Sequence, residues 1–494
     1  MHHQVPLRFD NSYARLPGRF YSRVAPEPVA GPVLIRVNEA LARQLGIDAD
    51  WLSSASGIEV IAGNRLPPGA DPIATAYAGH QFGSWNPRLG DGRAILLGEL
   101  TAADGARFDL QLKGSGRTPY SRGGDGRAPL GAVLREYVVS EAMAALGIPT
   151  TRTLAAASTG EWLWRDAEVP GAILVRVAQS HIRIGTLQYF SALRDIEGLR
   201  LLVEHVIARH YPDLAGAANP ALALLQRVIA RQAQLVARWQ LTGFIHGVMN
   251  TDNMLLSGET IDYGPCAFMD GFDPDAVYSS IDQAGRYAYR NQPAIAHWNL
   301  VCLAGALLPV MEPDPDAAVA AAQQAVDAFA PQYEQAYRAG MARKLGIGRL
   351  RDGDDELIQD LLAVMADTRA DFTLTFRSLA DSVAARPPGG DVGGIYALPQ
   401  ALAPWLQRWR ARLQGDALAA GARQAMMDAA NPAYIPRNHL VEEVIAAAVQ
   451  GGDLQPFHAL VDRLAEPCAF DAAQARYALP PRPEQVVRQT FCGT

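Results

Sequence analysis

Short apolar runs bounded by turn-forming residues mark the region from about residue 86 to 180. Residues 93–100 (RAILLGEL) and 108–113 (FDLQLK) are separated by the turn 102–105, which predicts two strands of a hairpin. A helix is predicted over 129–146, because Pro129 suits a first helical turn and Gly147 and Pro149 stop it. Two further strand-like pieces, 161–166 and 171–177, complete a strand-rich region.

From about residue 194 the apolar residues recur at helical spacing. Residues 224–244 place apolar side chains three to four apart, with Arg and Gln between them, which predicts an amphipathic helix. A polar stretch follows, and 254–264 has the shape of a small hairpin around Ser257-Gly258. The chain then continues to about 470 as Ala- and Leu-rich helix, interrupted by a Pro- and Gly-rich linker at 386–394.

This pattern predicts an α+β fold in which a small strand-rich lobe precedes a large helical lobe. We expect four parts: an N-terminal extension (1–85), a small nucleotide-binding lobe (86–185), a helical lobe with catalytic and metal-binding loops (186–385), and a C-terminal helical extension with a cysteine-bearing tail (386–494). The order of the two lobes is typical of a bilobal, protein-kinase-like architecture.

Composition narrows the class of protein. Of 494 residues, 49% are hydrophobic and 19% charged, and the net charge is −7, so we expect a globular protein that binds neither nucleic acid nor an anionic membrane. No segment is expected to span a membrane, and residues 1–18 lack the apolar core of a signal peptide. The four cysteines form no CxxC pair, which argues against structural zinc. We expect a cytoplasmic monomer.

The strongest chemical signal is His246, Asn253 and the triplet Asp262-Tyr-Gly. Kinases hold Mg²⁺ on ATP with an Asn and an Asp at this spacing, and oxygen ligands suit that ion. The alternative is a polar turn that caps helices. Val248 occupies the position of a kinase's catalytic Asp, so either catalysis is lost or another base acts, and Asp252 is the obvious substitute.

Lys113 ends the second predicted strand and is the candidate partner of the nucleotide phosphates. In kinases such a lysine pairs with a helix glutamate, and both Glu136 and Glu141 lie on the following helix. A strand lysine can also be an ordinary solvated residue, but the Gly- and Arg-rich loop that follows this one favours function.

Two glycine-rich loops flank the Lys113 strand, and glycines allow backbone N–H groups to approach a phosphate. Neither loop contains the GK[ST] of a Walker A motif. Arg176 and Arg183 could reach the same cleft or could be surface charges. The loop residues are Gly90, Gly92 and Arg93 in the first loop, and Gly114, Gly116, Arg117, Arg122, Gly123, Gly124, Gly126 and Arg127 in the second.

Over nearly its whole length the chain resembles the selenoprotein O (YdiU) family of protein adenylyltransferases, long regarded as pseudokinases. The resemblance rests on YAGHQF at 77–82, LGDGR at 89–93, KGSGRTPYS at 113–121, GDGR at 124–127, HGVMNTDN at 246–253, IDYGP at 261–265, RNQP at 290–293, and Asn431-Pro through RNH at 437–439.

The resemblance implies a kinase-like fold that binds ATP in a flipped orientation and transfers AMP to Ser, Thr or Tyr hydroxyls of proteins. It implies Mg²⁺ on Asn253 and Asp262, Asp252 as proton acceptor, and Glu136 as partner of Lys113. UMP transfer supported by Mn²⁺ is also attributed to bacterial relatives. The nucleotide-binding residues carried over by position are Gly90, Gly92, Arg93, Lys113, Asp125, Gly126, Glu136, Arg176, Arg183 and Asp262.

The same resemblance places Cys492 where some relatives carry selenocysteine, which can bond to a cysteine after the metal-binding Asp. The equivalent stretch, 272–286, contains no cysteine, and Cys266 is the nearest candidate. Two other functions stay open: a kinase-type phosphotransferase, which Val248 disfavours, and an inactive nucleotide-binding pseudokinase, which the retained Lys113 and Asp262 disfavour.

Overall fold

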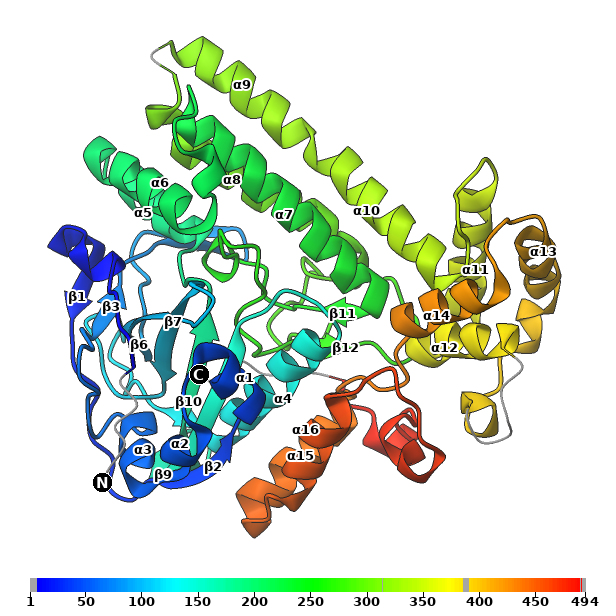
Figure 1. Ribbon diagram of the computed structural model, residues 1–494, viewed down its shortest axis with the longest axis horizontal. Helices are drawn as coiled ribbons and strands as arrows, with labels where there is room; N and C mark the ends of the chain where they lie inside the picture. Colours follow the sequence, from blue (N-terminus) through cyan, green and yellow to red (C-terminus); the bar gives the residue numbers. More distant parts are fainter. Residues whose placement is uncertain (1–6, 313, 385–390, 489, 491–494) are drawn as a thin grey trace.

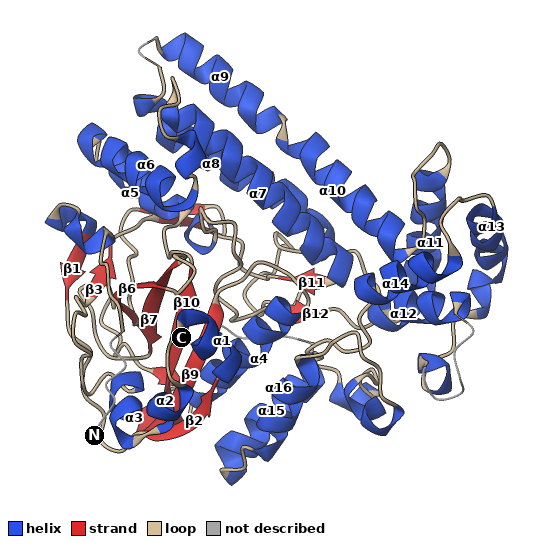
Figure 2. Cartoon of the chain, viewed as in Figure 1, coloured by secondary structure: helices blue, strands red, loops and turns tan. Residues whose placement is uncertain are grey.

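The computed structural model describes residues 7–312, 314–384, 391–488 and 490 (Figure 1). It is a mixed α and β fold in which one antiparallel sheet lies beside a large assembly of helices (Figure 2). Along the sheet the strands follow the order β1 (Tyr21–Arg23), β3 (Ile73–Thr75), β6 (Ala94–Thr101), β7 (Arg107–Lys113), β10 (Glu168–Ala178), β9 (Arg152–Trp164) and β2 (Val33–Val37), while β8 (Ala128–Pro129) pairs with β10.

The sheet confirms the predicted strands and extends them. The runs 93–100 and 108–113 correspond to β6 and β7, and 171–177 is part of the longer β10. The run 161–166 overlaps only the end of β9, because residues 165 and 166 already belong to the turn before β10. The N-terminal segment is more than an extension, because β1, β2 and β3 all belong to this sheet. Their brevity, three to five residues each, left too little pattern to predict them.

Helices cover both faces of the sheet. On one face, α1 (Glu39–Leu45), α2 (Ala49–Ser53) and α3 (Ala55–Ile61) share a core with Leu112 of β7. On the other, α4 (Leu130–Ala145) packs on β9 and β10 and is backed by α15 (Asn438–Gly451) and α16 (Gln455–Leu464). Because side chains alternate along a strand, Lys113 points to the α4 face. The predicted helix 129–146 is confirmed as α4.

The remaining helices form the larger part of the molecule, with α7 at its centre against α8, α9 and α10 (Figure 1). The helix predicted over 224–244 is α7. The bounds are α5 (Ile184–Ala192), α6 (Ile196–His210), α7 (Pro220–Thr242), α8 (Gln292–Leu307), α9 (Pro315–Asp327), α10 (Phe329–Lys344), α11 (Asp354–Thr368), α12 (Phe372–Val383), α13 (Ala403–Gln414) and α14 (Ala420–Ala430).

One described stretch, Tyr289–Val310, is long and apolar enough to cross a membrane. The expectation that no segment has the length and composition of a membrane span was therefore wrong. Its helix α8 is a core element. Gln292 accepts a hydrogen bond from the His246 N–H at 3.0 Å, and Asn299 donates to the Met249 carbonyl at 2.9 Å. These polar contacts attach α8 to the predicted catalytic loop.

Two short antiparallel pairings lie near that loop: the hairpin of β4 (Gly79–Gln81) and β5 (Ser84–Asn86), and the pair of β11 (Phe244–Ile245) and β12 (Ala267–Phe268), which the loop itself connects. The hairpin predicted at 254–264 is present only as a single antiparallel bridge between Met254 and Thr260. Most of the predicted linker 386–394 lies outside the described residues, and its end, Val392–Gly394, is a short 3-10 turn.

Candidate functional site

A cavity of about 660 Å³ lies where the sheet meets the loops that follow α7. Both predicted glycine-rich loops and the polar loop 248–262 line it, so segments distant in sequence converge on one space. The predicted residues that line it are Gly90, Gly92, Arg93, Lys113, Asp125, Gly126, Arg176, Arg183, Asp252, Asn253 and Asp262.

Glu136 does not line the cavity but lies behind its wall, where it holds two of the lining cations. Its carboxylate is buried, forms a short ion pair with Lys113, and accepts the Arg176 Nε–H at 2.7 Å. Burial alone would raise the pKa of Glu136, but the charges of Arg176 and Lys113 outweigh it and lower the pKa. Glu141 faces elsewhere and pairs with Arg152 at 2.7 Å.

Sheet register explains why those cations meet. Lys113 pairs with Ala94 on β6 and Leu174 on β10, and Arg176 lies opposite Gln111. Gln111 is two residues before Lys113, so Lys113 and Arg176 point to the same face. The result is a positively charged floor on which phosphate groups would be stabilised.

Asp252 and Asn253 belong to a 3-10 turn, Thr251–Asn253, that forms another part of the cavity wall. Arg183 donates from Nη1 to the Asp252 carbonyl at 2.5 Å, and Asn253 donates from Nδ2 to the Val248 carbonyl at 3.0 Å. The second bond leaves the Asn253 amide oxygen as an acceptor. Asp252 is buried, its Oδ1 has no hydrogen-bond partner, and burial raises its pKa to about 6.

Asp262 completes this wall in an unusual backbone conformation. Its φ of 69° lies in the left-handed region, which a residue with a side chain rarely adopts. The neighbouring Ile261 carbonyl is hydrogen bonded to Nε2 of buried His246 at 2.8 Å, which ties the two predicted loops together. Asp262 lies 3.9 Å from Lys113 Nζ; burial would raise its pKa, but Lys113 and the arginines around it lower it to about 2.

These groups suit a divalent cation carried by a nucleotide. An ionised carboxylate and an amide oxygen are the hard ligands that Mg²⁺ takes, alongside waters and phosphate oxygens. No cluster of three or more His, Cys, Asp or Glu occurs in the described ranges. Asp252 Oδ1, buried and unpartnered, is a further acceptor at the same place.

The glycine-rich loops need their glycines for space as well as conformation. Gly90 has φ of 72°, and a Cβ there would overlap the Tyr120 ring; Gly126 has φ of 68°, and a Cβ would overlap the Gly116 carbonyl. Asp125 lies at the cavity but is already paired with Arg165, at 2.9 and 3.0 Å. Its carboxylate therefore shapes the loop in this structure.

Sequence reasoning missed two residues of the site. Asp91 is buried between the two predicted glycines and accepts from Thr75. Its Oδ1 has no hydrogen bond but forms an ion pair with Arg183 at 3.7 Å. Gln81 donates from Nε2 to Asp252 Oδ2 at 3.2 Å. Asp91 could have been noted from its place between Gly90 and Gly92, whereas the contact of Gln81 depends on folding.

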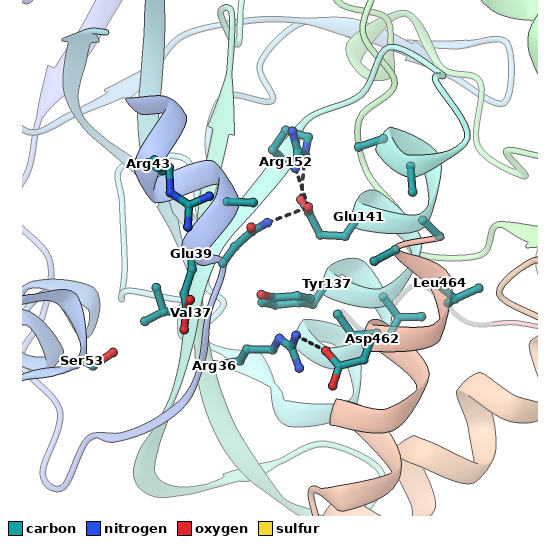
Figure 3. A pocket seen from close by; sticks show the side chains of 18 residues that line it. Arg36, Val37, Glu39, Arg43, Ser53, Tyr137, Glu141, Arg152, Asp462 and Leu464 are labelled. Carbon is teal, nitrogen blue, oxygen red and sulfur yellow. Dashed lines mark hydrogen bonds and ion pairs between the residues drawn. The ribbon is translucent and has the colours of Figure 1, made fainter. Parts of the chain in front are cut away.

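A larger cavity, of about 820 Å³, lies between α1, α4 and α16 (Figure 3). Most of its charged groups satisfy one another: Arg36 pairs with Asp462 at 2.5 Å, and Glu141 accepts from Arg152 and from Asn38. Of the residues that the sequence singled out, only Glu141, the alternative partner of Lys113, lines it. The smaller cavity is therefore the candidate active site.

Comparison with known proteins decides the family. The model of the family described as "Protein adenylyltransferase SelO" matches residues 3–465. The chain belongs to the SelO family. Relatives named "Protein nucleotidyltransferase YdiU" include those of Rhodopseudomonas palustris strain BisB18 (58% identical over 490 residues, covering 99% of this chain and 100% of the relative) and Bradyrhizobium sp. strain BTAi1 (57% over 493 residues, 99% and 100%). This member of the SelO family is therefore an enzyme of the nucleotidyltransferase class.

The described cysteines, Cys266, Cys302 and Cys468, are free thiols, and burial raises the pKa of Cys266 to about 12. Cys492 lies outside the described residues, so its predicted role stays a prediction. Thr490, two residues earlier, donates to the Pro265 carbonyl at 2.6 Å, which brings the end of the described chain next to Cys266.

Proposed function

We propose that this enzyme transfers AMP from ATP, or UMP from UTP, to Ser, Thr or Tyr hydroxyls of proteins. The observation that carries the proposal is the arrangement around one cavity of a cationic floor, Lys113 and Arg176, facing Asp252, Asn253 and Asp262. The names of its relatives, which describe protein nucleotidyltransferases, support a protein acceptor.

In this proposal the floor and the loops bind the triphosphate. Lys113, Arg93 and Arg176 stabilise phosphate charge, and Gly90, Gly92 and Gly126 let the backbone approach it. Asn253 and Asp262 would hold Mg²⁺ or Mn²⁺, which supplies charge stabilisation to the phosphates when bound. The phosphate-binding residues and the metal ligands line the same cavity, so one bound nucleotide could contact both groups.

Asp252 takes the proton. The acceptor oxygen attacks the α-phosphorus, the bond from that phosphorus to the α–β bridging oxygen breaks, pyrophosphate leaves, and the hydroxyl proton passes to the Asp252 carboxylate. The pKa of about 6 that burial gives Asp252 suits a base at neutral pH. Val248 at the usual position of a kinase's base fits a nucleotide bound with its α-phosphate toward the acceptor.

We also propose that the sheet and the helical part correspond to the two lobes of a protein-kinase-like fold, with the site between them. The Lys113–Glu136 pair and the His246-to-Asn253 spacing support this correspondence. A cytoplasmic monomer that binds neither nucleic acid nor membrane agrees with the net charge of −7.

Mass spectrometry separates this function from its alternatives. Cell proteins from wild-type and Asp252→Ala strains are digested and searched for modified hydroxyl residues. We expect adenylyl or uridylyl groups only in the wild type. Phosphate in their place would establish the phosphotransferase, and identical proteomes with retained ATP binding would establish the inactive pseudokinase.

A further inference from the structure

The hairpin β4–β5 covers the loop that carries the proposed base. His80 N–H donates to Thr251 Oγ1 at 2.8 Å, and Phe82 N–H donates to Asn250 Oδ1 at 3.0 Å. With Gln81 bonded to Asp252, three successive hairpin residues contact three successive residues of the loop. The hairpin and the segment beside it also contribute Gln81, Phe82 and Ile281 to the lining of the cavity that Asp252 faces.

The segment beside it brings a cation, Arg286, to the hairpin. A Cβ at Gly83, in the hairpin turn, would lie 3.6 Å from the guanidinium of Arg286, which also lies 4.8 Å from the ring centroid of Trp298 on α8. Stacking on an aromatic ring holds a guanidinium in place while leaving its charge uncompensated.

Arg286 has no anionic partner in the described part of the chain. None of the ion pairs there includes it, and its Nε is buried without a hydrogen bond. The nearest carboxylate along the chain, Asp282, is occupied by backbone: its oxygens accept the N–H groups of Arg286 and Tyr287 at 2.9 and 2.8 Å. A half-buried cation without a carboxylate is an incomplete site.

The hairpin and the segment that carries Arg286 also expose apolar groups. Trp85, on β5, is 41% exposed, and Ile281, which lines the cavity, is 63% exposed. His80 lies between Trp85 and Trp298, with ring centroids 4.9 and 5.2 Å away. A surface with aromatic rings around an unpaired arginine is typical of a protein-binding site.

We propose that Arg286, Trp85 and Ile281 form the acceptor-docking surface, and that it binds an acidic segment of the protein acceptor beside the hydroxyl to be modified. This inference rests on the proposed function, since it assigns an acceptor to the same site. Charge complementarity selects the partner: Arg286 pairs with an Asp or Glu side chain, and Trp85 and Ile281 cover its apolar neighbours.

Binding of peptides tests the inference without requiring catalysis. Three fluorescein-labelled peptides with a central Ser, flanked by Asp, by Asn or by Lys, are titrated with the full-length enzyme, and binding is followed by fluorescence anisotropy. We expect the Asp peptide to bind about tenfold more tightly than the Asn peptide, as one charge-assisted contact gives. Arg286→Gln should abolish the preference, Arg286→Lys should keep most of it, and Arg286→Glu should reverse it toward a Lys-flanked peptide.

Arg290 provides a matched control. It lies on the same segment, is exposed, and is already paired with Asp275 at 2.8 Å, so Arg290→Gln should leave the preference unchanged. Equal binding of the Asp and Asn peptides by the wild type, or a preference that survives Arg286→Gln, would overturn the docking surface. Failure of the proposed function is distinguishable, since it abolishes nucleotide transfer to every peptide while this binding preference persists.

Discussion

Glu136 pairs with two cations of the site, and replacing it by Gln gives a quantitative prediction. Its carboxylate is 1% exposed and is the shared partner of Lys113 and Arg176. Glutamine keeps the volume and one acceptor but removes the charge, so two buried cations remain with little compensation. Removing one member of a buried ion pair typically costs about 3–5 kcal/mol.

The structure places the expected cost at the lower end of that range. Asp262 lies 3.9 Å from Lys113 Nζ and retains its charge, because its pKa is about 2. It compensates part of the lost attraction, so we expect Glu136→Gln to destabilise the protein by about 3 kcal/mol. Nucleotide transfer should fall as well, because Lys113 and Arg176 lose their common orientation.

Urea unfolding followed by tryptophan fluorescence measures the cost, and nucleotide transfer is assayed in parallel. Glu141→Gln is the control: the same substitution on the same helix, whose partner Arg152 is 27% exposed. Because the Glu141 carboxylate also accepts from Asn38 and from the Thr153 N–H, Glu141→Gln should destabilise the protein too. It should cost less than Glu136→Gln, since it leaves one partly exposed cation rather than two buried ones, and it should leave transfer unchanged. A loss below about 1 kcal/mol for Glu136→Gln, with transfer intact, would refute the role assigned to Glu136.

Three further substitutions test the surroundings of the site. Gly79→Ala should reduce kcat at least about tenfold with nucleotide binding retained, because the new Cβ would lie 2.7 Å from Asp252 Oδ1; unchanged kcat contradicts this. Gln81→Ala should lower kcat rather than raise the KM for ATP, since Gln81 orients Asp252; a change confined to KM contradicts it. Burial raises the pKa of Glu259 from 4.5 to about 7, so the folded protein favours the protonated carboxyl. The free energy of unfolding of the wild type therefore falls by up to about 3 kcal/mol as the pH rises from about 4.5 to about 7. Glu259→Gln should therefore raise Tm relative to wild type at about pH 8 but not at about pH 4.5, and equal Tm shifts at both would contradict the assignment.

Several site residues could be predicted from sequence because local pattern determines their positions. Lys113 ends an apolar strand, Glu136 lies on a helix with clear start and stop residues, and the Asn253-to-Asp262 spacing spans one short loop. Each of these depends on contacts within a few residues or between adjacent elements, and the structure brings all of them to one cavity or its wall.

The rest depends on contacts between distant segments. Gln81 contacts Asp252 across 171 residues, and no periodicity in the sequence signals such a pairing. The same holds for β1 to β3, which join a sheet built mostly from residues 94–178, and for Arg286, whose stacking on Trp298 requires α8 to pack beside the catalytic loop. The membrane-length run at 289–310 likewise becomes interpretable only through its buried contacts.

The position of the transferred phosphorus tests the central claim most directly. Purified enzyme and an acceptor-containing cell extract are incubated in parallel with α-³²P-ATP and γ-³²P-ATP, and Asp252→Ala serves as the control. The account predicts protein-bound label from the α position alone, lost in the variant. Label from the γ position alone would contradict it and assign the site to phosphate transfer.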